Sequence, residues 1–416
     1  MNFFFKKILF SLLCFIFILN FSLSYADDIE EGYLEDTTLE TSTQKTSELN
    51  INARSCIVLD RPSKKILYGK KENNKVKMAS TTKIMTATII IENCNLNQTI
   101  EVSKKAAGTG GSRLGLKTGD KLTIRDLLYG LMLCSGNDAA VALAETCCGN
   151  ISEFCNLMNN KAKELGLNNS HFETPHGLDS DGHFTTAYEL ALLSDYALQN
   201  KIFYNIVGTK TYTVTINGFP KNISNTNELL GNLPGIYGIK TGFTNGANRC
   251  LVTACKRNNI DIICVVLGCD TKKFRTQDSI KLIEYTFKNF EYVNISEKIT
   301  NEFKKWMQEN NNRFNIYKGI SNNLDLKLSD LQNPIVPIKK DKIELIKINI
   351  NYNKNLTAPV KEKTTVGKIE VTINDNVITS LDILNSNSIT KKSFLNYLYE
   401  FMYNYSSILN SVLSIK

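Results

Sequence analysis

The chain has 416 residues, of which 42% are hydrophobic, and its formal net charge is +8. This length and apolar content allow at least one large core and favour two domains over one. The mild positive excess is not gathered into arginine clusters, so it does not indicate a nucleic-acid partner. The eleven cysteines lack metal-ligand spacing and are interpreted as small buried hydrophobic residues, so neither a metal nor another cofactor is expected.

The N-terminal segment 1–26 has the pattern of a secretory signal peptide. Two lysines precede an apolar run at 8–21, and the small residues that end the segment predict cleavage after Ala26. The alternative is a retained membrane helix, because the apolar run is near the lower length limit for spanning. Residues 27–50 are rich in Asp, Glu, Thr and Ser and are expected to form a flexible linker.

Residues 51–290 are predicted to form one α+β domain. Strand-like runs stand at both ends of this region, at 55–60, 65–68, 236–242, 249–255 and 260–267. Apolar residues at helical spacing fill the middle, at 78–91, 122–148 and 151–165. An Asn-Gly turn joins two of the late strands and favours an antiparallel meander. We therefore expect an antiparallel sheet covered by helices.

A small β-rich domain is predicted at 291–388. A charged helical stretch at 301–314 comes first, and short alternating runs such as 343–350 and 367–373 follow it.

The last segment, 389–416, is predicted to be an amphipathic helix. Its apolar residues share one helical face: Phe394, Leu398, Phe401, Tyr405, Ile408, Val412 and Ile415. Such a helix lies on a membrane better than it crosses one, and its tyrosines favour the lipid interface. A helix packed on the second domain is the alternative. With the signal peptide, this segment predicts an exported protein at the outer face of the cytoplasmic membrane.

Three short motifs bring together hydroxyl, amine and amide groups: Ser80-Thr-Thr-Lys83, Ser135-Gly-Asn137 and Lys240-Thr-Gly242. A lone Ser-x-x-Lys is more often an exposed helix face than a nucleophile. Here the first motif opens a predicted helix, the second lies in a turn and the third lies on a strand. Their order and context together make the combined signal specific.

The first motif places Ser80 and Lys83 on one face of a helix, so that the amine can reach the hydroxyl. If Lys83 is buried near a second cation, Lys240, its pKa should fall, and the neutral amine can accept the Ser80 proton. The backbone N–H groups of Ser80 and Phe243 are expected to form an oxyanion hole.

The other two motifs supply binding groups. The Ser135 hydroxyl is expected to relay a proton between the amine of the first motif and a leaving amine, and Asn137 to hold that amine and a substrate amide. Lys240 and Thr241 are expected to bind a terminal carboxylate, while Gly242 leaves room for a substrate backbone along the strand.

With these motifs, residues 51–290 resemble the D-alanyl-D-alanine carboxypeptidases, the low-molecular-weight penicillin-binding proteins among the serine peptidases. The stretches at 135–140, 175–179 and 235–242 are similar to that family's, and the β-rich region with its terminal helix is similar to the family's usual appendage. The resemblance implies a β-lactamase/transpeptidase-like fold. It also implies removal of D-alanine from peptidoglycan stem pentapeptides through an acyl-enzyme on Ser80, and acylation of that serine by penicillin and other β-lactams.

The resemblance also implies that Arg275 helps to hold the substrate carboxylate. Some relatives have a second arginine where this chain has Ser224-Asn-Thr226, so the carboxylate clamp is expected to be weaker. His176 is interpreted as a structural hydrogen-bonding residue, because the Ser-Lys pair already provides a base.

Two other functions are weighed against this one. A β-lactamase needs a carboxylate that activates water, and Glu164-Leu-Gly-Leu-Asn168 fits such a pattern superficially, yet Glu164 ends a predicted helix before a capping glycine. A catalytically silent cell-wall binding protein would not need the intact motifs.

Overall fold

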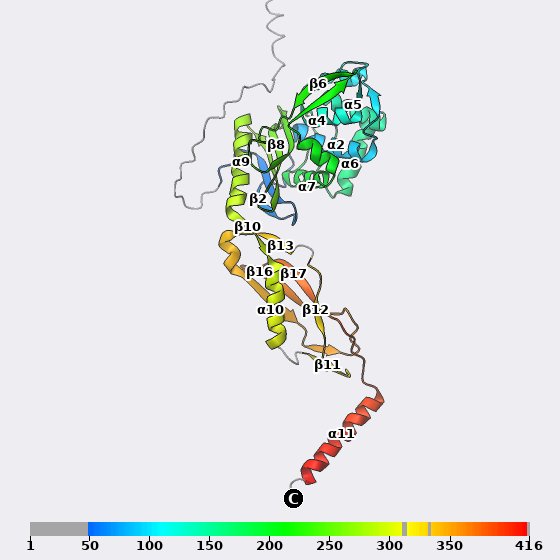
Figure 1. Cartoon of the computed structure of the whole chain (residues 1–416), viewed down its shortest axis with the longest axis vertical. Helices are drawn as coiled ribbons and strands as arrows, with labels where there is room; N and C mark the ends of the chain where they lie inside the picture. The colour runs from blue at the N-terminus through cyan, green and yellow to red at the C-terminus, as the bar shows by residue number, and fades with distance from the viewer. Residues whose placement is uncertain (1–48, 310–313, 332–333, 414–416) are drawn as a thin grey trace, which may run out of the picture. The chain divides into compact units, whose positions relative to one another are not determined.

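The computed structural model describes residues 49–309, 314–331 and 334–413 (Figure 1). The predicted signal peptide, 1–26, and all but the last two residues of the predicted linker, 27–50, lie outside the described residues.

An antiparallel five-stranded sheet organises the region from β1 onward, in the order β2-β1-β9-β8-β7. Its strands are β1 (Ser55–Asp60), β2 (Ile66–Lys70), β7 (Ile236–Thr244), β8 (Asn248–Arg257) and β9 (Ile260–Cys269). Nearly every residue of the central strand β9 is buried, because helices cover both faces of the sheet. The predicted meander of the last three strands is confirmed.

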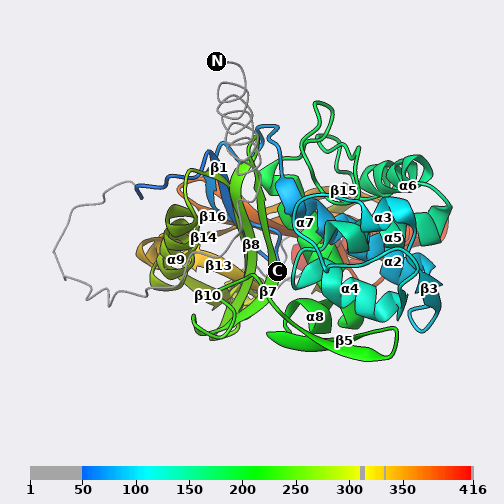
Figure 2. The same ribbon diagram turned by 90° about the horizontal axis from the view of Figure 1, so that it is seen from above.

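Helices cover both faces of this sheet: α9 packs on one face, whereas η1, α7 and α8 pack on the other and are themselves covered by the helices around α2 (Figure 2). Their bounds are η1 (Ala79–Thr82), α2 (Lys83–Asn93), α3 (Lys104–Ala107), α4 (Ile124–Met132), α5 (Asn137–Cys148), α6 (Ile151–Glu164), α7 (Ala187–Leu198), α8 (Lys201–Val207) and α9 (Lys272–Asn289). Side-chain caps begin several of them; Thr271, for example, accepts a hydrogen bond from the Phe274 N–H at the start of α9. Two short hairpins complete the region: β3 (Thr99–Glu101) with β4 (Lys121–Thr123), and β5 (Thr211–Ile216) with β6 (Phe219–Ser224).

The chain after α9 is rich in strands, as predicted. A four-stranded antiparallel sheet has the order β12-β17-β16-β14, and its partners are β12 (Leu326–Leu328), β14 (Ile346–Tyr352), β16 (Thr365–Ile373) and β17 (Asn376–Asn385). Two strand pairs join β10 (Phe290–Asn294) to β13 (Ile335–Lys339) and β11 (Asn315–Tyr317) to β15 (Asn355–Thr357). The short η2 (Lys340–Leu345) precedes β14. The buried apolar side chains of these strands form a core together with α10.

The predicted helical stretch at 301–314 is placed too late. The observed helix, α10, spans Ile295–Glu309. It begins where the Asn294 side chain accepts a hydrogen bond from the Ser296 N–H, and Ile295, Ile299 and Phe303 form its buried face. The prediction followed the charged residues of the stretch, whereas this earlier apolar spacing decides where the helix lies.

The last described element, α11 (Phe394–Leu413), is helical as predicted, and its large apolar side chains up to Ile408 are exposed. Among the residues that the structure describes, no helix is both long enough and apolar enough to cross a membrane.

A buried carboxylate fixes the loop before α4. Asp138, in the first turn of α5, has no exposed surface and accepts hydrogen bonds of 2.8, 2.8 and 2.9 Å from the backbone N–H groups of Leu114, Gly115 and Leu116. Asp138 directly follows Asn137, which is the last residue of the second motif and the first residue of α5. Its carboxylate therefore holds the loop against the start of that helix.

We predict that Asp138→Ala lowers the free energy of unfolding by about 3 kcal/mol, because it leaves buried backbone donors without an acceptor. Urea denaturation followed by circular dichroism measures this change. Asp181→Ala is the matched control, since that side chain is fully exposed and pairs only with Lys77 at 3.9 Å; it should unfold as the parent does. A loss in Asp138→Ala no greater than in the control would contradict the assignment.

Candidate active site

Ser80 lies in a tight turn that is held from two sides. It is half-buried in η1, directly after Ala79, whose backbone φ of 48° is in the left-handed region. A Cβ atom on Gly242 of β7 would lie 3.1 Å from the Ser80 nitrogen, and one on Gly177 would lie 1.9 Å from the Ala79 carbonyl oxygen. Glycine is therefore needed at Gly177 for the loop to approach the turn, and at Gly242 a larger residue would press on the turn. The room predicted at Gly242 for a substrate is, in part, room for the Ser80 turn.

The Lys83 amine is completely buried and contacts three oxygen atoms. Its Nζ lies 2.8 Å from Ser80 Oγ, 2.7 Å from Asn137 Oδ1 and 2.8 Å from the His176 carbonyl oxygen. The amide and carbonyl oxygens can only accept hydrogen bonds, whereas the hydroxyl can also donate. A neutral amine has two N–H groups for the two obligate acceptors and one lone pair for the hydroxyl. The three N–H groups of an ammonium would also match the three oxygens, so the contacts allow both a charged Lys83 and a neutral Lys83 that accepts a hydrogen bond from Ser80.

Burial and a neighbouring charge favour that neutral form. Desolvation lowers the pKa of Lys83 well below its ordinary value, and the nearby Lys240 ammonium lowers it further. Lys240 is itself only 1% exposed, and its Nζ donates to the Thr241 carbonyl oxygen at 3.1 Å. The structure thus brings both lysines of the predicted site together.

The second motif lies beside Lys83, where α5 begins. Asn137 donates through Nδ2 to the Gly110 carbonyl oxygen at 2.7 Å, so its amide links Lys83 to the loop before α4. Ser135 is 6% exposed and has a backbone φ of 63°, an uncommon conformation for serine. Within the described part of the chain, its hydroxyl has no hydrogen-bond partner, which leaves it available to a ligand.

The third motif lies on β7, at the edge of the sheet. Thr241 shares a 2.6 Å hydrogen bond with the Thr226 hydroxyl, which comes from the segment after β6. Phe243 pairs with Arg249 across the β7–β8 hairpin, and the Arg249 guanidinium stacks on its ring. The contact between Gly242 and the Ser80 turn brings the start of the Phe243 peptide next to Ser80.

Arg275 is buried in the first turn of α9, and its guanidinium already has a carboxylate partner. Nη2 donates to Glu228 Oε1 at 3.0 Å. The predicted substrate-carboxylate ligand is therefore bound to a side chain of the protein itself in this structure.

Some contacts of the site are absent from the three motifs. The His176 carbonyl, the Thr226 hydroxyl and the Gly110 carbonyl come from loops, and folding brings them to Lys83, Thr241 and Asn137, respectively. His176 keeps a structural role, because its ring accepts a hydrogen bond from the Leu178 N–H and burial lowers its pKa to about 3. Of these groups, only the Thr226 hydroxyl had a local signal in the sequence. Thr226 lies in the segment Ser224-Asn-Thr226, where some relatives have an arginine.

Glu164 lies on the surface at the end of α6 and does not supply the site with a carboxylate. It ends α6, is 62% exposed, and forms an ion pair of 2.9 Å with Lys161 one turn earlier. This placement agrees with the interpretation of the Glu-x-x-Leu-Asn pattern as a chance similarity.

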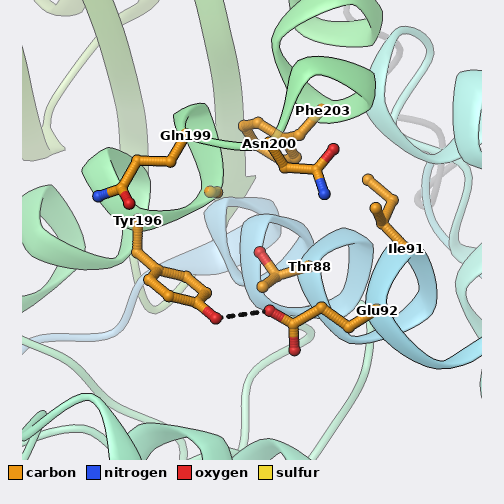
Figure 3. A pocket seen from close by; sticks show the side chains of 8 residues that line it. Thr88, Ile91, Glu92, Tyr196, Gln199, Asn200 and Phe203 are labelled. Carbon is orange, nitrogen blue, oxygen red and sulfur yellow. Dashed lines mark hydrogen bonds between the residues drawn. The ribbon is translucent and has the colours of Figure 1, made fainter.

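A separate pocket lies between the C-terminal half of α2 and helices α7 and α8 (Figure 3). Thr88, Glu92, Tyr196 and Phe203 are among its lining residues, and the Tyr196 hydroxyl donates to Glu92 at 2.8 Å. None of the residues predicted to carry chemistry lines this pocket.

Comparison with known proteins identifies two family matches. Residues 41–271 match the D-alanyl-D-alanine carboxypeptidase family, and residues 304–391 match the C-terminal domain of penicillin-binding protein 5. The chain is 30% identical to D-alanyl-D-alanine carboxypeptidase DacF of Bacillus subtilis, over 85% of this chain and 90% of that protein.

Two solved structures are also similar. Penicillin-binding protein 5 of Haemophilus influenzae is 26% identical, with a TM-score of 0.68 over 83% of this chain and 100% of that one. The DD-transpeptidase of Streptomyces K15 is 33% identical, with a TM-score of 0.56 over 58% of this chain and 99% of that one.

We predict that Lys240→Met raises the pKa of Lys83, because it removes the neighbouring positive charge. The pKa should stay below the ordinary lysine value, since burial is the larger cause. Titration of protein with ¹³C-labelled lysine side chains, followed by NMR, measures the shift. Lys288→Met, at an exposed position on α9, is the control and should leave the Lys83 resonance unchanged. An unchanged Lys83 pKa in Lys240→Met would remove the proposed coupling between the two amines.

Proposed function

We propose, since the chain belongs to the D-alanyl-D-alanine carboxypeptidase family, that Ser80 is the nucleophile of its reaction. The protein is a serine-type D-Ala-D-Ala carboxypeptidase that acts in peptidoglycan metabolism and binds β-lactams. The observation that best supports the proposal is the 2.8 Å contact between Ser80 Oγ and the Nζ of Lys83, a fully buried amine whose pKa is lowered by desolvation and by Lys240.

In the first step, Ser80 Oγ attacks the carbonyl carbon between the two D-alanines of a stem pentapeptide. Lys83 accepts the hydroxyl proton as the Oγ–C bond forms. The negative charge that develops on the carbonyl oxygen is stabilised by the backbone N–H groups of Ser80 and Phe243. The contact of β7 with the Ser80 turn supports this pairing of donors.

The tetrahedral intermediate then releases D-alanine. The proton on Lys83 passes through the Ser135 hydroxyl to the leaving nitrogen while the C–N bond breaks, and an ester on Ser80 remains. Attack by water on this ester releases the shortened peptide and regenerates Ser80. A β-lactam acylates the same serine when its ring amide opens, and the resulting ester is hydrolysed slowly.

The substrate's terminal carboxylate is held by residues in the middle of β7. Lys240 supplies a positive charge, and the Thr241 hydroxyl supplies a donor that is positioned by Thr226. Arg275 contributes a second positive charge, although its Nη2 is shared with Glu228. Asn137 holds the substrate amide while its Oδ1 fixes Lys83.

We predict that Ser80→Ala abolishes both D-alanine release and covalent labelling by a fluorescent penicillin, because no other group can form the ester. Lys83→Ala should slow labelling at least ~100-fold, since general-base assistance is lost. Lys240→Ala should mainly raise KM for the peptide. In-gel fluorescence and chromatographic assay of D-alanine measure these effects.

Ser296→Ala, a serine of α10, is the control for labelling and should match the parent. Labelling of Ser80→Ala would exclude this serine as the nucleophile, and a parent that takes no label would favour a cell-wall binding protein. Rapid turnover of penicillin by the parent would favour a β-lactamase over a carboxypeptidase. Equal labelling rates in Lys83→Ala and the parent would rule out Lys83 as the base.

Residues 1–26 are proposed to be a signal peptide, with a linker at 27–50, a catalytic domain at 51–290 and a β-rich domain at 291–388. The segment 389–416 is proposed to attach the enzyme to the outer surface of the cytoplasmic membrane. In α11, Phe394, Leu398, Phe401, Tyr405 and Ile408 are exposed and share one apolar face. An extracytoplasmic location agrees with a substrate that is part of the cell wall.

We predict that the purified mature chain sediments with phosphatidylglycerol-containing vesicles and that Phe401→Asp reduces the bound fraction several-fold, because it places a charge in the apolar face. Ser407→Asp, which adds the same charge to the opposite face, is the matched control and should have a smaller effect. Equal binding by both variants would argue against an interfacial helix, and the peptidase activity in solution should be the same in all three proteins.

A further inference from the structure

The Glu228 carboxylate occupies a site built for a carboxylate. Arg275 Nη2 donates to its Oε1 at 3.0 Å, the Thr276 hydroxyl donates to the same oxygen, and Lys272 Nζ lies 3.3 Å from Oε2. A guanidinium, an ammonium and a hydroxyl are the donors that proteins use to bind the carboxylates of ligands. Here all three converge on a side chain of the same chain.

This group lies at the same end of the sheet as the Ser80 site. Gly242 of β7 pairs with Cys250, the neighbouring Arg249 pairs with Cys269 at the end of β9, and α9 starts three residues later. From the other side, Glu228 follows Thr226 by two residues, and the Thr226 hydroxyl is bonded to Thr241. Glu228 and Arg275 therefore join the segment beside the substrate strand to the first turn of α9.

The Arg275 guanidinium is only partly used. Its side chain is 5% exposed, whereas that of Glu228 is 34% exposed. Among the described residues, Nε of Arg275 is buried and has no hydrogen-bond partner. An unsatisfied buried donor is costly, so a second carboxylate oxygen at this nitrogen would be favourable. Glu228 thus contacts one nitrogen of the Arg275 guanidinium, a group that can bind a carboxylate through two nitrogens.

Glu228 stays ionised under ordinary conditions. Burial opposes its ionisation, but the hydrogen bond from Thr276 and the charges of Arg275 and Lys272 outweigh burial and lower its pKa. The arginine therefore faces a negative charge of the protein whenever the substrate approaches.

We propose that Glu228 is a specificity-determining residue, which competes with the terminal carboxylate of the substrate for Arg275 and so weakens the preference of the enzyme for a free carboxylate. This inference rests on the proposed function and goes beyond it, because it assigns a role to a residue outside the three motifs. The Glu228 carboxylate adds negative charge where the negatively charged end of the substrate must bind. It also shares the Arg275 guanidinium that would hold the substrate carboxylate.

The test compares a tripeptide that ends in D-alanyl-D-alanine with the same peptide carrying a C-terminal amide. The ratio of the two kcat/KM values measures the preference for the carboxylate. Glu228→Gln keeps the shape of the side chain but removes its charge, and it should raise this ratio about 3- to 10-fold, mainly by lowering KM for the acid. Thermal unfolding of each variant shows whether the fold is kept.

Two further variants separate this role from a structural one. Glu284→Gln removes a carboxylate from α9, the helix that carries Arg275. Glu284 pairs with Arg257 at 2.8 Å, and its substitution should leave the ratio unchanged. In an Arg275→Gln background, Glu228→Gln should no longer raise the ratio, because the contested donor is absent.

An unchanged or lower ratio in Glu228→Gln would overturn the inference, as would an increase that persists without Arg275. Release of D-alanine by the parent chain tests the proposed function separately. A parent without that activity would refute both ideas, whereas an active parent whose ratio does not respond to Glu228→Gln would refute only the role of Glu228.

Discussion

Two buried amines, placed close together, are the constraint on which the site depends. A charged Lys83 would have to be desolvated beside Lys240, with no carboxylate in direct contact to offset the cost. The fold surrounds Lys83 with two obligate acceptors and one hydroxyl, and burial beside Lys240 favours the neutral amine over the charged one. Burial thus favours a neutral amine at a pH where an exposed lysine would be protonated.

The rest of the domain can be understood as the means of keeping this arrangement fixed. The carboxylate of Asp138 anchors the loop that carries Gly110, whose carbonyl holds the Asn137 amide. Ala79 and Ser135 both have left-handed backbone conformations, which set the direction of the residues in two of the motifs. These uncommon conformations persist because the surrounding structure holds them. Backbone groups and loops therefore do as much positioning as the motif side chains.

The sequence predicted the regular elements well because their signals are local. Alternation and helical spacing located the sheet, its meander and the helices α2, α4, α5 and α6, but not α7, α8 and α9. The three motifs identified Ser80, Lys83 and Lys240 before any contact was known. The carbonyl of His176 and the hydroxyl of Thr226 carry no such pattern, because any residue has a carbonyl and threonines are common. Glu228 was hidden for a related reason: its importance lies in Arg275, which is 47 positions away. The start of α10 was misplaced because charged residues mark a surface, whereas the buried spacing from Ile295 decides the helix.

The two glycines that flank the Ser80 turn have a consequence for comparing genomes. Neither Gly177 nor Gly242 has a side chain that could take part in a reaction, yet a methyl group at either position would collide with or press on the segment that holds Ser80. A duplicated copy that has lost its serine but kept both glycines would still be able to build the turn. In degenerate copies of this enzyme, the two glycines would thus indicate that the fold of the turn is kept. The Ser80 hydroxyl and the Lys83 amine would indicate that the reacting groups are kept.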